Sequence, residues 1–144
     1  MNKIIAYAAL VALIGTPASA ATPAFPVQFQ WTWASEISAC EAELTQGIVI
    51  RSGEVSFYDG PERLIGLKGP RRWKSRSGPA TTYLATFVTA TPKGVGRDAA
   101  RGKPYTMRYT LAGKKLYVSS STTPEAMQFT TENRFVKCPR KSYG

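Results

Sequence analysis

From Gly47 onward the sequence consists of short segments in which apolar and polar residues alternate, separated by turns rich in glycine and proline. Thr81–Ala90 is the clearest of these segments, because it is rich in the β-branched and aromatic residues that favour strands. Tyr105–Leu111 alternates in the same way, with a large apolar side chain at every second position. Strand-like segments at this regular spacing predict a mostly β, antiparallel meander.

The turns between the predicted strands follow from local signals. Ser52-Gly53 is typical of a hairpin, and Thr91–Pro104 is a loop by composition. Gly69-Pro70 and Gly78-Pro79 are both expected to end a strand. The segments predicted as strands are Val27–Trp33, Ile48–Arg51, Glu54–Tyr58, Arg63–Lys68, Thr81–Ala90, Tyr105–Leu111, Lys115–Ser119, Met127–Thr130 and Arg134–Cys138.

One segment departs from the alternating pattern. Ser35–Gln46 places Ile37, Cys40 and Leu44 on one helical face, and Ser35 suits a helix start. The pattern predicts one short helix after the first strand, which would carry Cys40 inward.

The two cysteines, Cys40 and Cys138, support closure of the meander. Such a pair usually bonds in an oxidising compartment, and these two lie 98 positions apart, after the first and at the end of the last predicted strand. A barrel of about eight strands would make the first and last strands neighbours and remove exposed edges. The sequence therefore predicts a Cys40–Cys138 disulfide in a small barrel, although a sandwich would also allow this pairing.

Residues 1–20 have the build of a cleavable signal peptide. Lys3 precedes the uncharged apolar run Ile4–Gly15, and Ala18-Ser19-Ala20 is a small-x-small cleavage site. The run has about twelve residues whereas a membrane-spanning helix needs roughly twenty, which favours cleavage over a retained anchor. We expect a periplasmic or secreted monomer that does not span the membrane once cleaved, with residues 21–144 forming a single β-barrel-like domain.

The charge along the chain is uneven. Removal of Lys3 reduces the 19 basic residues to 18 against 9 acidic ones, a net charge of +9. Residues 36–62 hold six of the acids and one base, whereas residues 63–115 hold thirteen bases and one acid, Asp98. This asymmetry indicates either a surface that binds anions or a solvated face that keeps the protein soluble.

The chain contains no histidine, and this restricts its chemistry. Ser-His-Asp and Cys-His nucleophilic sites are excluded, as are histidine-ligated metals. Glu54, Asp59 and Glu62 gather about a predicted turn, where solvation explains them better than a hydrolytic pair of acids. We therefore expect no enzymatic activity, no catalytic residue, no metal and no cofactor.

A segment that mixes cations with a tryptophan is the best candidate for a binding site. Guanidinium groups bind phosphate and carboxylate bidentately, and an indole ring could stack on a sugar or base. The candidate anion-binding residues are Arg63, Lys68, Arg71, Arg72, Trp73, Lys74 and Arg76, and a second basic loop holds Lys93, Arg97, Arg101 and Lys103. Both loops at one barrel end would form an anion-binding rim. The alternative is that Trp73 plugs that end and the charges only hydrate it.

Five aromatic residues alternate on neighbouring predicted strands: Tyr83, Phe87, Tyr105, Tyr109 and Tyr117. They are interpreted as core and barrel wall, and the alternative is a stripe that lines a ligand cavity. An open interior would favour a carrier, whereas side chains that fill it would favour binding at the surface.

The overall layout carries a family resemblance. Its features are the leader, Trp31 and Trp33, Cys40, Gly47-Ile48-Val49-Ile50, Val55-Ser56-Phe57-Tyr58 and Cys138. In these features the chain resembles small secreted, eight-stranded, calycin- or lipocalin-like barrel proteins of Gram-negative bacteria. The resemblance covers the layout of the mature chain, contains no specific motif, and implies no functional residue.

These observations predict a non-enzymatic binding or accessory protein. A carrier of a small apolar ligand in the barrel mouth is the second hypothesis, and a hydrolase is the last. The expected partner is an anionic envelope component, namely lipopolysaccharide, an acidic glycan or an anionic lipid, or else an acidic protein. Nucleic acid fits the chemistry but is scarce in a periplasm, so we do not expect it.

Overall fold

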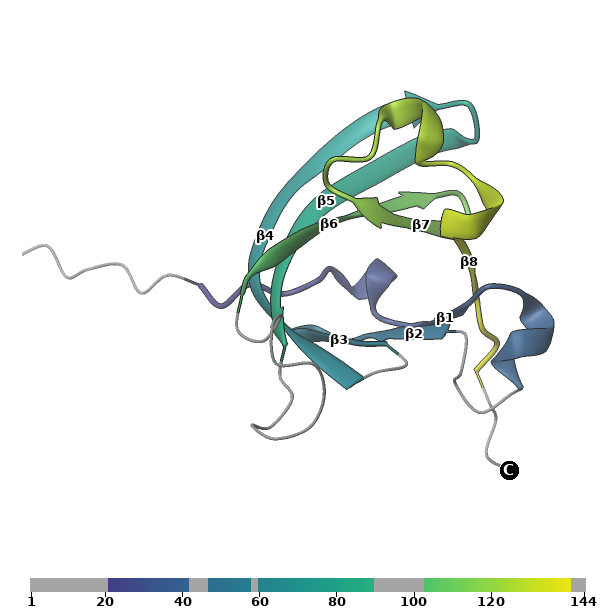
Figure 1. Ribbon diagram of the computed structural model, residues 1–144. Helices are drawn as coiled ribbons and strands as arrows, with labels where there is room; N and C mark the ends of the chain where they lie inside the picture. Colours follow the sequence, from purple (N-terminus) through teal and green to yellow (C-terminus); the bar gives the residue numbers. More distant parts are fainter. Residues whose placement is uncertain (1–20, 42–46, 58–59, 90–102, 141–144) are drawn as a thin grey trace, which may run out of the picture.

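The computed structural model describes residues 21–41, 47–57, 60–89 and 103–140. Within these ranges the chain forms a closed barrel of eight antiparallel strands that follow one another in sequence order (Figure 1). No helix of the described ranges is long and apolar enough to cross a membrane. The predicted signal peptide and most of the predicted Thr91–Pro104 loop lie outside the described residues.

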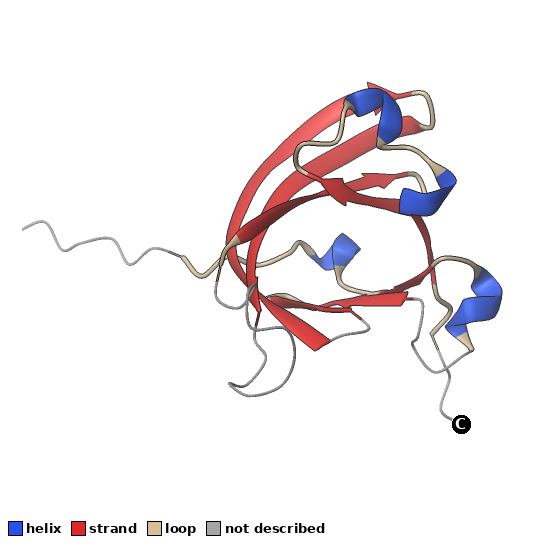
Figure 2. Ribbon diagram, in the orientation of Figure 1, coloured by secondary structure: helices blue, strands red, loops and turns tan. Residues whose placement is uncertain are grey.

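The elements are short apart from two long strands, β4 and β5. The strands are β1 Thr32–Ala34, β2 Gly47–Ile50, β3 Glu54–Phe57, β4 Gly60–Ser75, β5 Gly78–Thr89, β6 Tyr105–Ala112, β7 Lys115–Ser120 and β8 Arg134–Lys137. Four single turns of 3-10 helix, blue in Figure 2, complete the described chain: η1 Val27–Phe29, η2 Ile37–Cys40, η3 Glu125–Met127 and η4 Thr131–Asn133.

Closure of the barrel joins its first and last strands. β1 pairs with β2 on one side and with β8 on the other, and Trp33 lies opposite Lys137. The predicted Cys40–Cys138 disulfide is present beside this junction, with the two Cα atoms 5.5 Å apart. The backbone N–H of Cys138 also donates to the Thr32 carbonyl at 2.9 Å. The predicted barrel and disulfide are therefore both confirmed.

The prediction of a strand over Val27–Trp33 is wrong in its first half. Residues Val27–Phe29 form η1, which begins after Pro26, and only Thr32–Ala34 are β1. Phe29 and Trp33 are buried, and the Trp33 indole N–H donates to the Phe29 carbonyl at 3.0 Å. Val27 is 80% exposed. The burial of Phe29 and Trp33 and the exposure of Val27 thus result from the turn of η1, not from the alternation of a strand.

In the described part of the predicted helix Ser35–Gln46, residues 35–41, the only helical element is the single turn η2, and residues 42–46 lie outside the described part. Ile37, which was expected to face the core, is 57% exposed. Cys40 is only half-buried rather than carried inward. The disulfide to Cys138 attaches this turn to the barrel, so an apolar face is not needed to hold it there.

The predicted strand break at Gly69-Pro70 is also wrong, because β4 continues through it to Ser75. β3 pairs only with residues 60–63 of β4, and no other described strand pairs with the rest of that edge. Proline is tolerated on such an edge because its missing N–H has no partner to lose. Gly69 has φ +133°, a conformation that suits glycine alone. Gly78-Pro79 does not end a strand either but begins β5.

The predicted strand over Met127–Thr130 is absent, and the chain between β7 and β8 instead forms η3 and η4 over the outside of the barrel (Figure 2). Arg108 holds the start of this connection. Its guanidinium donates to the Ser121 carbonyl at 2.9 Å and to the Thr123 carbonyl at 3.0 Å. Pro124 precedes η3 and favours a turn there. Side-chain packing on the barrel surface therefore replaces strand pairing in this segment.

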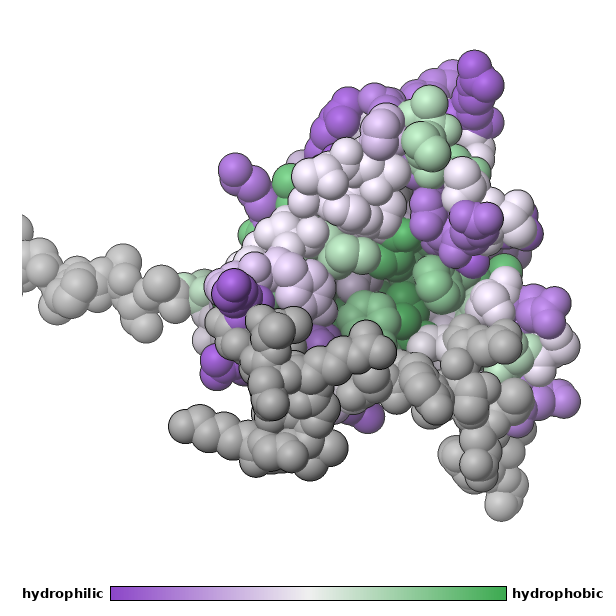
Figure 3. All heavy atoms as spheres, viewed as in Figure 1, coloured by the Kyte–Doolittle hydropathy of each residue, from purple (hydrophilic) through white to green (hydrophobic). Residues whose placement is uncertain are grey.

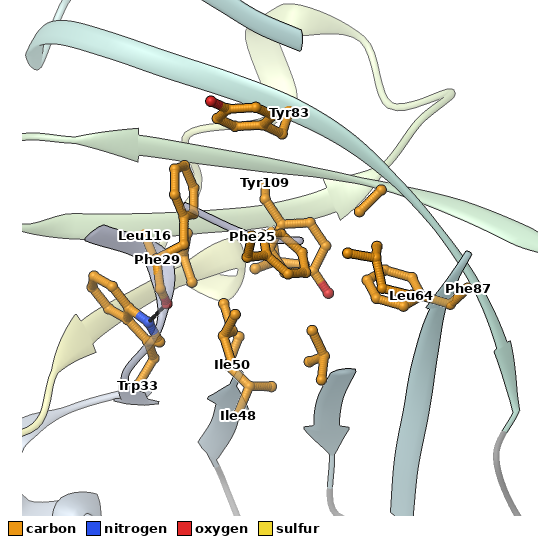
Figure 4. Packing of buried hydrophobic residues seen from close by; sticks show 13 residues of the cluster. Phe25, Phe29, Trp33, Ile48, Ile50, Leu64, Tyr83, Phe87, Tyr109 and Leu116 are labelled. Carbon is orange, nitrogen blue, oxygen red and sulfur yellow. Dashed lines mark hydrogen bonds between the residues drawn. The ribbon is translucent and has the colours of Figure 1, made fainter. Parts of the chain in front are cut away.

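Aromatic and aliphatic side chains form one buried cluster inside the barrel (Figure 4). The segment before β1 enters the barrel and places Phe25 and Phe29 between its walls. The Phe25 ring centroid lies 5.2 Å from that of Tyr109, and Phe29 lies 5.4 Å from Tyr83. Phe87 and Tyr109 are fully buried in the same cluster. The side chains of this cluster occupy the space between the walls of the barrel.

Candidate functional site

The long hairpin of β4 and β5 brings most of the predicted basic residues together. Beyond Arg63, β4 is a sheet edge that pairs only with β5 among the described strands. The hairpin ends in a two-residue turn, Arg76-Ser77, because Ser75 pairs with Gly78. Hydrophilic residues cover the end of this hairpin at the upper edge of the molecule in Figure 3. The predicted loop is thus a strand with a free edge.

Strand register assigns the basic residues to the two faces of the hairpin. Arg71 pairs with Thr82 and Lys68 pairs with Leu84, two residues further along β5. Lys68 and Arg71 are three residues apart on β4, whereas their partners on β5 are two residues apart. This β-bulge keeps Lys68 and Arg71 on the same outer face of the sheet. Arg72 pairs with Thr81 and therefore lies on the opposite face.

All the cations at this end of the hairpin are exposed. They are Lys68, Arg71, Arg72, Lys74 and Arg76. Arg51–Glu54 is the only ion pair among the residues that the structure describes, so none of these cations is paired with a described carboxylate. These cations lie on both faces and in the turn of one hairpin. Their closeness raises the positive electrostatic potential around the hairpin end.

Trp73 lies on the outer surface of the barrel and does not plug its end. Its indole N–H donates to Oγ1 of Thr82 at 2.9 Å, and its ring centroid lies 5.5 Å from that of Phe129. Phe129 in turn packs on Tyr117, with centroids 4.9 Å apart. The Arg71 guanidinium lies 5.4 Å from the Trp73 ring centroid, within cation–π range. Trp73 is half-buried, so part of its ring remains accessible.

Two predicted parts of the site lie elsewhere. Arg63 pairs with Val88 near the start of β4, roughly 25 Å along the strand from Arg71. Lys103 is exposed just before β6, at the end of β5 opposite the hairpin turn. Successive connections of a meander lie at opposite ends, so Lys103 does not share a rim with the hairpin turn. Lys93, Arg97 and Arg101 lie outside the described residues.

The structure adds a pocket that the sequence did not indicate. It has a volume of about 450 Å³ and lies between the hairpin turn and η3. Its lining residues are Trp73, Ser75, Arg76, Ser77, Glu125, Ala126 and Phe129. No sequence signal links the two halves, because Glu125 and Trp73 are far apart in the chain and the Met127–Thr130 segment favours a strand.

The predicted aromatic stripe divides between the two sides of the sheet. Tyr83, Phe87 and Tyr109 belong to the interior cluster, whereas Tyr117 packs in the outer cluster with Trp73. Tyr105 is 36% exposed. The interpretation as core and wall is confirmed for the three interior residues.

Comparison of the chain with protein-family models, curated proteins and solved structures found no match. The resemblance to small secreted barrel proteins therefore stays a prediction beyond the barrel itself. Within the described residues, no group of three or more Cys, Asp or Glu side chains is placed to hold a metal ion.

Proposed function

We propose that this chain is a non-enzymatic binding protein of the periplasm or extracellular space that binds polyanions through the β4–β5 hairpin. The observation that carries the proposal is the set of five exposed cations at the hairpin end, none paired with a described acid. Like charges so close together repel one another, and an anionic partner relieves that repulsion. The sequence signal for export and the disulfide support the location.

The arrangement of the cations favours an extended or multivalent anion. Lys68 and Arg71 lie on one face, Arg72 on the other, and Arg76 in the turn. A single small anion would contact only part of this set, whereas a chain or surface that carries many charges would contact all of it. Lipopolysaccharide, an acidic glycan, an anionic membrane lipid and an acidic protein have this character, and the location argues against nucleic acid.

The proposal is tested by binding of the mature protein to immobilised heparin, used as a model polyanion, and to lipopolysaccharide across a salt series. Replacing Arg71, Arg72 and Arg76 with Ala should lower affinity by roughly tenfold or more and flatten the salt dependence. The matched control loses the same charge from exposed positions away from the hairpin end, Arg63, Lys103 and Arg140. Equal loss in both variants, or no loss in either, would contradict a role for the hairpin.

A further inference from the structure

The pocket between the hairpin turn and η3 has the size of a small-molecule site. Its volume of about 450 Å³ falls within the range of roughly 300–1,000 Å³ that ligand pockets occupy. Residues from two distant parts of the chain form it: Ser75–Ser77 at the hairpin turn, and Glu125–Phe129 around η3. The Arg108 hydrogen bonds to the Ser121 and Thr123 carbonyls hold the chain just before the second part.

One wall of the pocket is a fixed aromatic surface. The only polar group of the Trp73 side chain is already bound to Thr82, so this residue offers the pocket its ring. Phe129, which also lines the pocket, meets the indole at 61° and meets Tyr117 at 67°, and these ring contacts hold the wall in place. A rigid indole surface suits the apolar C–H face of a pyranose ring.

The polar rim of the pocket carries both signs of charge. Arg76 can bind a carboxylate or phosphate bidentately, and Ser77 adds a hydroxyl beside it. Glu125 lies in the same lining but forms no ion pair with Arg76. A carboxylate would weaken a site for a plain anion, whereas it accepts hydrogen bonds from a ligand that also carries hydroxyl groups.

We infer that this pocket binds an anionic pyranose, a sugar unit that bears a carboxylate or a phosphate. The inference rests on the proposed polyanion binding and specifies it, because the outer row of Lys68 and Arg71 leads along β4 to Trp73. A polymer that follows this row would place one sugar unit against the indole, with its anionic group at Arg76 and its hydroxyls at Glu125.

The test titrates the mature protein with glucuronate and with glucose 1-phosphate and follows the Trp73 indole N–H signal by NMR. Acetate and inorganic phosphate supply the charge without the sugar, and glucose supplies the sugar without the charge. The two acidic sugars should bind at least about tenfold more tightly than any of these three compounds. Acetate or phosphate binding as tightly, or an indole signal that does not move at saturation, would overturn the inference. Comparison of the two acidic sugars separates uronate-containing glycans from phosphorylated sugars as sources.

Two variants locate the binding and separate the two proposals. Ala126 is exposed on η3, so Ala126→Trp should fill the pocket without unfolding the barrel, and acidic-sugar affinity should fall about tenfold or more. Lys103→Ala, beyond the opposite end of β5, should leave it unchanged. Ala126→Trp should still bind heparin, because its cations are intact, but more weakly than the wild type, because no sugar unit can then lie against Trp73. Unchanged acidic-sugar binding in Ala126→Trp would overturn the inference that this pocket is the sugar site. A wild type that does not bind heparin would instead overturn the polyanion proposal.

Discussion

The indole N–H of Trp73 donates a hydrogen bond to Oγ1 of Thr82 at 2.9 Å, across the β4–β5 pair on the outside of the barrel. Thr82 Oγ1 lies 2.9 Å from Oγ1 of Thr110 on β6, so one hydroxyl joins three strands. This contact orients the ring that walls the proposed sugar pocket. It also makes Trp73 part of a small outer core rather than a free surface residue.

Thr82→Val should therefore destabilise the protein by about 1–2 kcal/mol, because it leaves the half-buried indole N–H and the Thr110 hydroxyl without their partner. Urea unfolding followed by tryptophan fluorescence measures the change. The matched control is Thr86→Val, which breaks a similar bond to Thr106 that includes no tryptophan. Equal effects of the two substitutions would show that the indole bond contributes nothing of its own.

Phe29→Ala should destabilise the barrel by about 3–5 kcal/mol, because the fully buried ring leaves a cavity against Tyr83. Chemical denaturation gives the free energy of unfolding. Val27→Ala, two residues away and 80% exposed, should change it by less than about 0.5 kcal/mol. Similar values for both variants would contradict the placement of this segment inside the barrel.

Gly69→Ala should destabilise the protein by about 1–3 kcal/mol, because φ is +133° and the new Cβ would lie 2.9 Å from the Thr82 carbonyl oxygen. Thermal unfolding provides the comparison with Gly53→Ala, where the added Cβ meets nothing within 4 Å. If the two variants melt together, then β4 does not pass Thr82 in the conformation described.

Burial raises the pKa of the Tyr109 phenol well above its ordinary value, and the charges of Tyr105 and Glu62 add to the shift. The unfolded chain therefore releases this proton first. The free energy of unfolding should be unaffected by this group below about pH 10 and should fall as the pH rises above it.

Tyr109→Phe tests this dependence. The phenol has no hydrogen-bond partner among the described residues, so the substitution should cost little stability at neutral pH. Urea unfolding between pH 8 and 11 should then show a smaller alkaline loss than in the wild type. An identical loss in both proteins would mean that another group is responsible.

Much of the barrel could be predicted from local patterns. Alternation and turn residues located β2, β3, β5, β6, β7 and β8, because strand preference and the Ser52-Gly53 turn depend on neighbours in the sequence. The positions of Cys40 and Cys138 predicted the disulfide and, with it, the meeting of the first and last strands. The cations at the candidate site were also evident from composition.

The rest was decided by contacts between distant segments. Gly69-Pro70 predicts a strand break from its local sequence, yet β4 continues through it. The proline lies on an edge of β4 that has no described partner strand, so its missing N–H costs no hydrogen bond. Met127–Thr130 reads as a strand, but Arg108 and the outer aromatic cluster hold the segment in turns. The pocket lies between the end of the hairpin that contains β4 and the turns that replace the predicted Met127–Thr130 strand. The sequence by itself determined which residues are available to bind an anion. Tertiary packing alone decided that Trp73, Arg76 and Glu125 line one site. The physical reason is that burial depends on which surfaces the whole chain brings into contact.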